Sequence, residues 1–151
     1  MKTTEQLVQE IADREAIRDL CDRYCDCIWR KDIDGLVKLF AEDGTFKVEG
    51  VEVEAISRGR RQLKKMYEKS IEKINPRPLV HSRIVDLLDS ARATGRCYVE
   101  VFSANVGMER LGFGYYEDEY SRVKDTWKFA SRRFSLDVID TTVSLRETFM
   151  V

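Results

Sequence analysis

The hydrophobic residues of this chain change their spacing near residue 79. Before that point they recur at intervals of three and four, the period of one face of an α-helix. The first such face consists of Ile17, Leu20, Cys21, Tyr24 and Ile28. After residue 79 the period becomes two, in extended segments at roughly 79–88, 92–104, 109–122 and 126–136. Helices followed by a run of strands predict an α+β fold.

Three helices are expected before the strands. Thr3 and Gln6 can form a capping box at the start of the first. Asp32 can cap a short second helix through GLVKLF that ends near Asp43-Gly44. A strand is expected over TFKVEGV. A third helix follows Gly59 and stops at Asn75-Pro76; its apolar face consists of Leu63, Met66, Tyr67, Ile71 and Ile74.

Short polar breaks separate the four extended segments. These breaks, at 89–91, at Gly107 and at Lys124-Asp125, suit tight antiparallel connections. A long, twisted antiparallel sheet is expected to curl around the helices that it buries. Such a sheet leaves a conical cavity, which is a natural site for a small molecule.

The composition limits the classes of partner. The chain has 151 residues, 43% of them hydrophobic, with no repeat or linker, and we expect one domain over 1–151. The 26 basic and 27 acidic residues give a net charge of −1, so nucleic acid is not expected as a partner. The N-terminus lacks the apolar core of a signal peptide, and no window has the length of a membrane span. We therefore expect a cytoplasmic protein that does not bind membranes.

The cysteines are interpreted as small apolar residues that stay reduced. Cys21, Cys25 and Cys27 lie in CDRYCDC, and Cys97 lies far away. This spacing lacks the paired C-x-x-C unit of a zinc ribbon, and two cysteines one helical turn apart resist disulfide geometry. No metal site is expected.

The order of several segments resembles one known family. These segments are REAIRDLCDRY, DIDGLVKLFAEDGTF, a helix after SRGRRQL, LVHSRI and GFGYYEDEYSRVKDTWKFASRR. Together they resemble, over about residues 5 to 137, the SnoaL-like or scytalone dehydratase-like branch of the NTF2-like superfamily. The resemblance implies an NTF2-like cone, in which three N-terminal helices pack in a strongly curved antiparallel sheet enclosing a pocket. It also implies a homodimer or homotrimer.

The resemblance also implies site residues. His81, the only histidine, matches the general base of the family's lyases. Tyr24 matches a residue that donates a hydrogen bond to substrate oxygen. Arg132 matches an arginine that faces the pocket, with Arg133 as the alternative if the register shifts. These three are the candidate catalytic residues, and the candidate substrate-binding residues are Trp29, Tyr116 and Phe46.

One departure from the family pattern concerns the partner of the histidine. The family's dyad aspartate lies five residues after the helix tyrosine, and this chain has Trp29 there. An indole cannot accept a proton as a carboxylate would. The substitute carboxylates considered are Asp22, Asp26, Glu100 and Asp118. Apart from the resemblance, a lone strand histidine is more often structural.

Two functions are therefore kept open. The first is a cofactor-independent lyase or isomerase, dehydratase-like, that acts on a small, largely apolar ring compound with His81 as general base. The second is a non-catalytic protein of the same fold that binds a small ligand or serves in an assembly. Neither function requires a metal or a cofactor. The role of residues 138–151 is left open.

Overall fold

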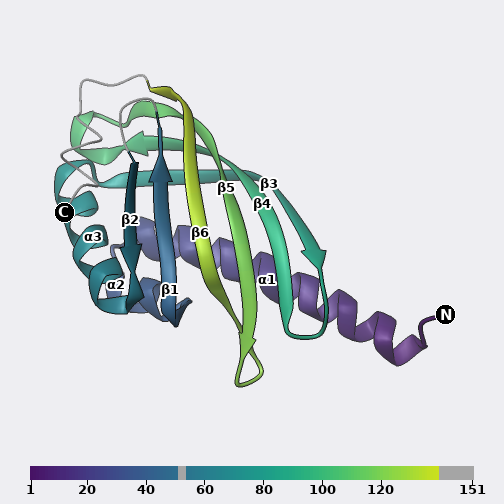
Figure 1. Ribbon diagram of the computed structural model, residues 1–151. Coiled ribbons are helices and arrows are strands. Elements are labelled where there is room, and N and C mark those ends of the chain that lie inside the picture. The colour runs from purple at the N-terminus through teal and green to yellow at the C-terminus, as the bar shows by residue number, and fades with distance from the viewer. Residues whose placement is uncertain (51–53, 140–151) are drawn as a thin grey trace.

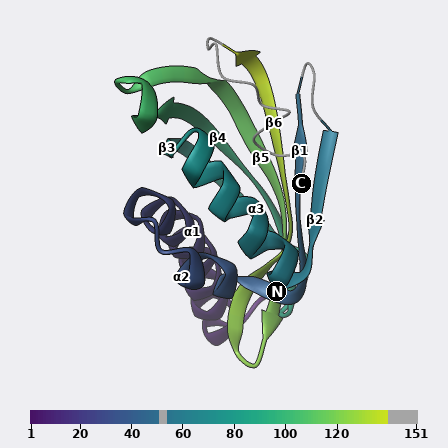
Figure 2. The same cartoon turned by 90° about the vertical axis from the view of Figure 1, so that its left-hand side faces the viewer.

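The computed structural model describes residues 1–50 and 54–139. The elements follow in the order α1 (Thr4–Arg30), α2 (Ile33–Lys38), β1 (Phe40–Glu49), β2 (Glu54–Arg58), α3 (Gly59–Lys73), β3 (Pro76–Leu87), β4 (Arg92–Ser103), a 3-10 turn (Ala104–Val106), β5 (Glu109–Val123) and β6 (Thr126–Ile139). Figure 1 shows the strands side by side with α1 crossing the sheet. In Figure 2 all three helices lie on the same side of the sheet.

The helices begin where the sequence predicts. Thr3 and Gln6 form the capping box of α1, and the Asp32 carboxylate accepts a hydrogen bond from the Gly35 amide, 2.9 Å away, at the start of α2. The expected end of the second helix is wrong. The helix stops at Lys38, because the chain enters β1 at Phe40 and Phe40 is fully buried in the core. None of the described helices is long and apolar enough to cross a membrane.

The sheet has the strand order β2-β1-β6-β5-β4-β3. The predicted antiparallel run from β3 to β6 is confirmed, and Lys124 and Asp125 form the β5–β6 turn with φ values of 51° and 63°. The expectation of a wholly antiparallel sheet is wrong, because β1 pairs with β6 in parallel. The sheet is therefore mixed, and β2 is a further edge strand that the sequence did not predict. The strong curvature of the sheet stays a prediction.

The core lies between the helices and the facing side of the sheet, here called the inner face. Residues 97, 99, 101 and 103 of β4 are buried there, whereas 98, 100 and 102 are more exposed on the outer face. The apolar face of α1 supplies its five predicted residues, all buried. This arrangement places Tyr24 of α1 opposite the inner-face residues of β5 and β6.

Candidate ligand-binding site

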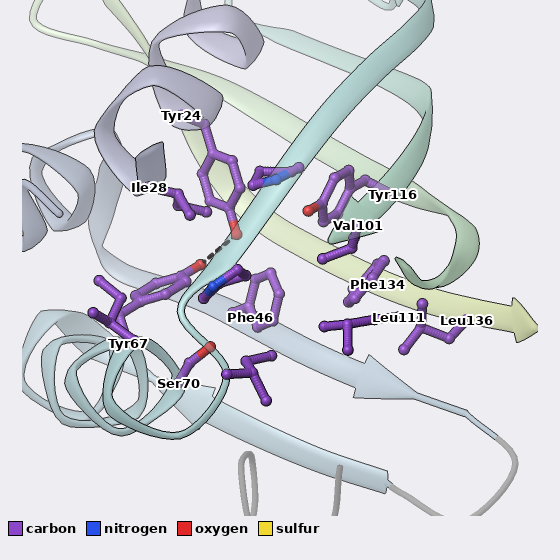
Figure 3. Close-up of a pocket in the computed structure, with 14 residues that line it drawn as sticks. Tyr24, Ile28, Phe46, Tyr67, Ser70, Val101, Leu111, Tyr116, Phe134 and Leu136 are labelled. Atoms are coloured by element: carbon purple, nitrogen blue, oxygen red, sulfur yellow. Dashed lines mark hydrogen bonds between the residues drawn. The ribbon is translucent and has the colours of Figure 1, made fainter. Parts of the chain in front are cut away.

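An apolar cavity lies between α1, α3 and the inner face of the sheet, with a volume of about 550 Å³ including its open mouth (Figure 3). Its wall consists of Tyr24, Ile28, Phe46, Tyr67, Ser70, Ile71, Ile74, Pro76, Pro78, Val101, Leu111, Tyr116, Phe134 and Leu136. Among the described residues, the wall contains no histidine, carboxylate, thiol or amine. Its polar side-chain groups are four hydroxyls, so the wall offers packing and hydrogen bonds rather than a base for neutral pH.

Two of these hydroxyls form a pair. The oxygens of Tyr24 and Tyr67 lie 2.9 Å apart, joining α1 to α3. Burial, together with the nearby Tyr67 phenol, raises the pKa of Tyr24 well above its ordinary value, and burial does the same for Tyr67. Both phenols therefore keep their protons at neutral pH. One proton is donated within the pair, and the other stays available to an acceptor in the cavity.

A third hydroxyl of the wall, that of Tyr116, comes from the sheet. Tyr116 lies on β5 with its ring centroid 5.7 Å from that of Tyr24, in an edge-to-face arrangement. Its hydroxyl makes no hydrogen bond to any residue in the described part of the chain, although the residue is buried. Burial raises its pKa well above the ordinary value, so it too stays a donor. Figure 3 shows Tyr24, Tyr67 and Tyr116 around the same space.

A buried positive charge lies behind these rings. The guanidinium carbon of Arg132 is 4.2 Å from the ring centroid of Tyr24 and 3.7 Å from that of Tyr116. Its Nε donates to Asp118 on the neighbouring strand at 2.9 Å, and both side chains are fully buried. Burial alone would lower the pKa of Arg132, but Asp118, together with the Cys21 and Cys97 thiols and the Tyr116 phenol, outweighs burial and the pKa is raised. Arg132 thus stays charged, behind the cavity wall rather than in it.

The structure does not bring His81 to this cavity. His81 lies at a β-bulge, where the pairing of β3 with β4 shifts between Val80 and Ser82. Its side chain is 54% exposed, and Nε2 is 3.0 Å from Glu100 on the outer face of the sheet. Of the carboxylates considered, Glu100 is therefore the partner of His81. His81 is not part of the cavity wall, where a general base acting on a bound compound would have to lie.

Trp29 also lies outside the cavity wall. Its indole nitrogen donates to the Pro78 carbonyl at 2.7 Å, and the guanidinium of Arg77 lies over its ring. The Cys25 thiol donates to the same carbonyl at 3.1 Å. This hydrogen bond from Trp29 connects the end of α1 to the start of β3. Its acceptor, Pro78, lines the cavity, whereas Trp29 does not.

The remaining predicted residues divide between the cavity and the surface. Tyr24, Tyr116 and Phe46 line the cavity. Arg133 pairs with Glu117 on the outer face, so the alternative register does not apply. Of the other substitute carboxylates, Asp22 pairs with Arg83, Asp26 with Arg30 and Asp118 with Arg132. Sequence reasoning missed Tyr67 and Ser70 as wall residues, because their helical spacing is also that of ordinary core positions.

Comparisons with known proteins agree with this architecture. The family profile of the SnoaL-like domain matches residues 9–133. A protein of unknown function from Mycobacterium tuberculosis superposes with a TM-score of 0.79 at 28% identity, over 93% of this chain and 82% of the other. No curated protein sequence matches the chain.

Two further solved structures share the fold. A candidate scytalone dehydratase from Novosphingobium aromaticivorans superposes with a TM-score of 0.73 at 20% identity, over 91% of this chain and 93% of the other. LinA superposes with a TM-score of 0.77 at 16% identity, over 89% of this chain and 93% of the other. At these identities the likeness concerns the fold alone. Because the profile spans most of the chain, the protein belongs to the SnoaL-like family, with an NTF2-like fold.

Proposed function

We propose that this protein binds a small, mostly apolar, ring-containing compound with one oxygen group in the cavity between α1, α3 and the sheet. The observation that carries the proposal is the Tyr116 hydroxyl, a donor with no hydrogen-bond partner among the described residues, in an aromatic and aliphatic wall. Tyr116 lines the cavity, so a ligand oxygen bound there can accept a hydrogen bond from this hydroxyl.

The chemistry around Tyr116 favours an oxygen that accepts hydrogen bonds. Tyr116 and the Tyr24–Tyr67 pair each have a proton to donate, and the charge of Arg132 lies behind two of the three rings. Both effects favour a carbonyl, phenol or enol oxygen with partial negative charge. The aromatic and aliphatic remainder of the wall favours a flat or ring-shaped hydrocarbon body.

Lyase or isomerase chemistry is the second candidate, and one observation favours it. His81 has a carboxylate partner in Glu100 at 3.0 Å, which is the pairing that a histidine base needs. The exposed position of the pair on the outer face argues against its action on a ligand in the cavity. LinA and the candidate scytalone dehydratase share the fold, but a shared fold does not determine activity.

Phenol is a suitable first probe, because it combines an aromatic ring with one oxygen. We expect the protein to bind phenol with a stoichiometry of one in ligand-observed NMR. Val101→Trp fills the cavity from β4 and should abolish binding. The control Ile84→Trp adds the same side chain at an exposed position of β3 and should bind normally.

Unchanged binding in Val101→Trp, with native circular dichroism, would place the ligand elsewhere and overturn the proposal. If that variant does not fold, Leu111→Phe adds a smaller bulk to the same wall. Incubation with phenols and ring ketones, followed by product analysis, tests the second candidate: turnover that His81→Ala abolishes would favour it. Self-association and a cytoplasmic location stay predictions.

A further inference from the structure

Two cysteines far apart in the sequence meet behind the cavity. Cys21 lies on α1 and Cys97 on β4, 76 positions later, and their sulfur atoms are 3.5 Å apart. Both side chains are buried, with exposed fractions of 0% and 1%. The sulfurs are therefore already in van der Waals contact, across the boundary between the helical layer and the sheet.

Polar groups surround the pair on the sheet side. The Cys97 thiol is placed to donate to Cys21, and the Cys21 sulfur is 3.2 Å from the Tyr120 hydroxyl. Tyr120 in turn donates to Asp118 at 2.8 Å. Asp118 is the carboxylate that holds Arg132. The thiols thus end a buried chain of hydrogen bonds.

Metal binding is a possible use of such a group, but the surroundings disfavour it. Ligand atoms of Cys21, Cys97 and Asp118 lie within 4.8 Å of one another. However, both oxygens of Asp118 already accept hydrogen bonds from Arg132. A cation would have to displace this guanidinium inside the protein, and its charge would add to that of the arginine. A modification of the two thiols that leaves them uncharged suits this site better than a bound cation.

We propose that Cys21 and Cys97 form a modification site, at which a peroxide converts the two thiols to an intramolecular disulfide that ties α1 to β4. This inference is independent of the cavity ligand. The sulfurs need to approach by about 1.5 Å to reach the disulfide bond length. The product carries no charge, and it removes two weak donors without leaving a buried donor unpaired.

The reaction proceeds in two balanced steps. In the first, the Cys21 sulfur attacks one oxygen of hydrogen peroxide. The O–O bond breaks, an S–O bond forms, and the departing hydroxide takes the thiol proton to give water and a sulfenic acid. In the second, the Cys97 sulfur attacks the Cys21 sulfur. The S–S bond forms, the S–O bond breaks, and a second water leaves with the Cys97 proton. The two thiols lose two electrons, which the peroxide gains.

The electrostatics assign the roles within the pair. The hydrogen bond from Cys97 and the charge of Arg132 lower the pKa of Cys21 despite its burial. The same hydrogen bond, with burial, raises the pKa of Cys97. Cys21 is therefore the attacking thiol and Cys97 the resolving one.

The other two thiols serve as internal controls. Cys25 donates to the Pro78 carbonyl, and burial raises its pKa to about 11. Cys27 is partly exposed, and burial raises its pKa. In the described part of the chain neither sulfur contacts another sulfur. Both are thus expected to stay out of the cross-link.

The test treats the full-length folded protein with hydrogen peroxide, traps the remaining thiols with iodoacetamide under denaturing conditions, and maps the peptides by mass spectrometry. We expect a peptide pair linked through Cys21 and Cys97 that dithiothreitol releases. Because the link closes a long loop, Tm should rise by roughly 5–10 °C without reductant. Cys27→Ser should give the same link and the same rise in Tm.

Cys97→Ser tests the assignment of roles. In this variant Cys21 should form a sulfenic acid that dimedone traps, and the rise in Tm should vanish. Full alkylation of both cysteines after peroxide treatment, or a link that involves Cys25 or Cys27, would overturn the proposal. The peptide map of the unmutated protein decides this even if the serine variant does not fold.

Discussion

The hydroxyl oxygens of Tyr24 and Tyr67 lie 2.9 Å apart inside the cavity, although 43 positions separate the two residues in the chain. The contact joins α1 to α3 at the point where both helices face the sheet. It also sets the chemistry of the cavity, because two hydroxyls that share one hydrogen bond present one free proton to a ligand. The hydroxyl of Tyr116 adds a second donor from β5.

Removal of one hydroxyl of this pair should have a modest and non-additive effect. Tyr67→Phe and Tyr24→Phe should each lower the free energy of unfolding by about 0.5–1.5 kcal/mol, because each loses the same hydrogen bond. The double variant should therefore lose less free energy of unfolding than the sum of the losses in the two single variants. Urea unfolding measures all three. Tyr115→Phe, at a half-buried position of β5, is the control. Strict additivity would show that the two hydroxyls do not interact.

Arg132 and Arg133 are adjacent in sequence but lie on opposite faces of β6, so they provide a matched comparison. Arg132→Met should lower the free energy of unfolding by about 3–5 kcal/mol, because it leaves Asp118 buried without its counter-ion. Arg133→Met, whose partner Glu117 is partly exposed, should cost about 0–1 kcal/mol. Equal losses in urea unfolding would contradict the assigned burial of Arg132.

Alkaline pH should destabilise the protein through its tyrosines. Four of the six tyrosines are buried, and burial raises the pKa of each: Tyr24, Tyr67, Tyr116 and Tyr120. Above pH ~10 the unfolded chain loses these protons while the folded chain keeps them. The folded state then binds more protons, so the free energy of unfolding falls as pH rises. Tyrosinate absorbance should show the four ionising only as the protein unfolds; ionisation of all six in the folded protein would refute this.

His81→Ala should have little effect on the stability of the protein or on its affinity for phenol. The imidazole is largely exposed, and its contact with Glu100 is a surface interaction, so the free energy of unfolding should change by less than about 1 kcal/mol. The affinity for phenol should stay within about twofold of the wild-type value. Isothermal calorimetry measures the second quantity. A large loss of affinity would mean that His81 reaches the ligand after all.

Local sequence signals predicted most of the elements. The apolar face of α1, the capping residues Thr3 and Asp32, and the breaks between the last four strands act over a few residues, so they are visible in the sequence. The parallel pairing of β1 with β6 was not predictable in this way, because a strand's own pattern does not specify its neighbour. The strand β2 has a single buried residue, Ser57, and hence no apolar alternation to reveal it.

The site was predicted less well than the fold, and His81 shows the reason. A bulge at this position shifts the register of β3, and a one-residue shift moves a side chain to the opposite face of a sheet. Family position alone does not contain this information. The placement of Arg132 behind Tyr24 and Tyr116, rather than beside them, likewise depends on packing between separate elements.

The most direct test of the proposed function compares phenol with toluene, which has nearly the same size and shape but lacks the oxygen. Calorimetric affinities for both are measured with the wild-type protein and with Tyr116→Phe, which removes only the hydroxyl of this side chain. We expect the variant to bind phenol about tenfold more weakly and toluene with unchanged affinity, since one hydrogen bond is lost. Equal affinities of the two proteins for phenol, or no binding of phenol to the wild-type protein, would contradict the proposed site.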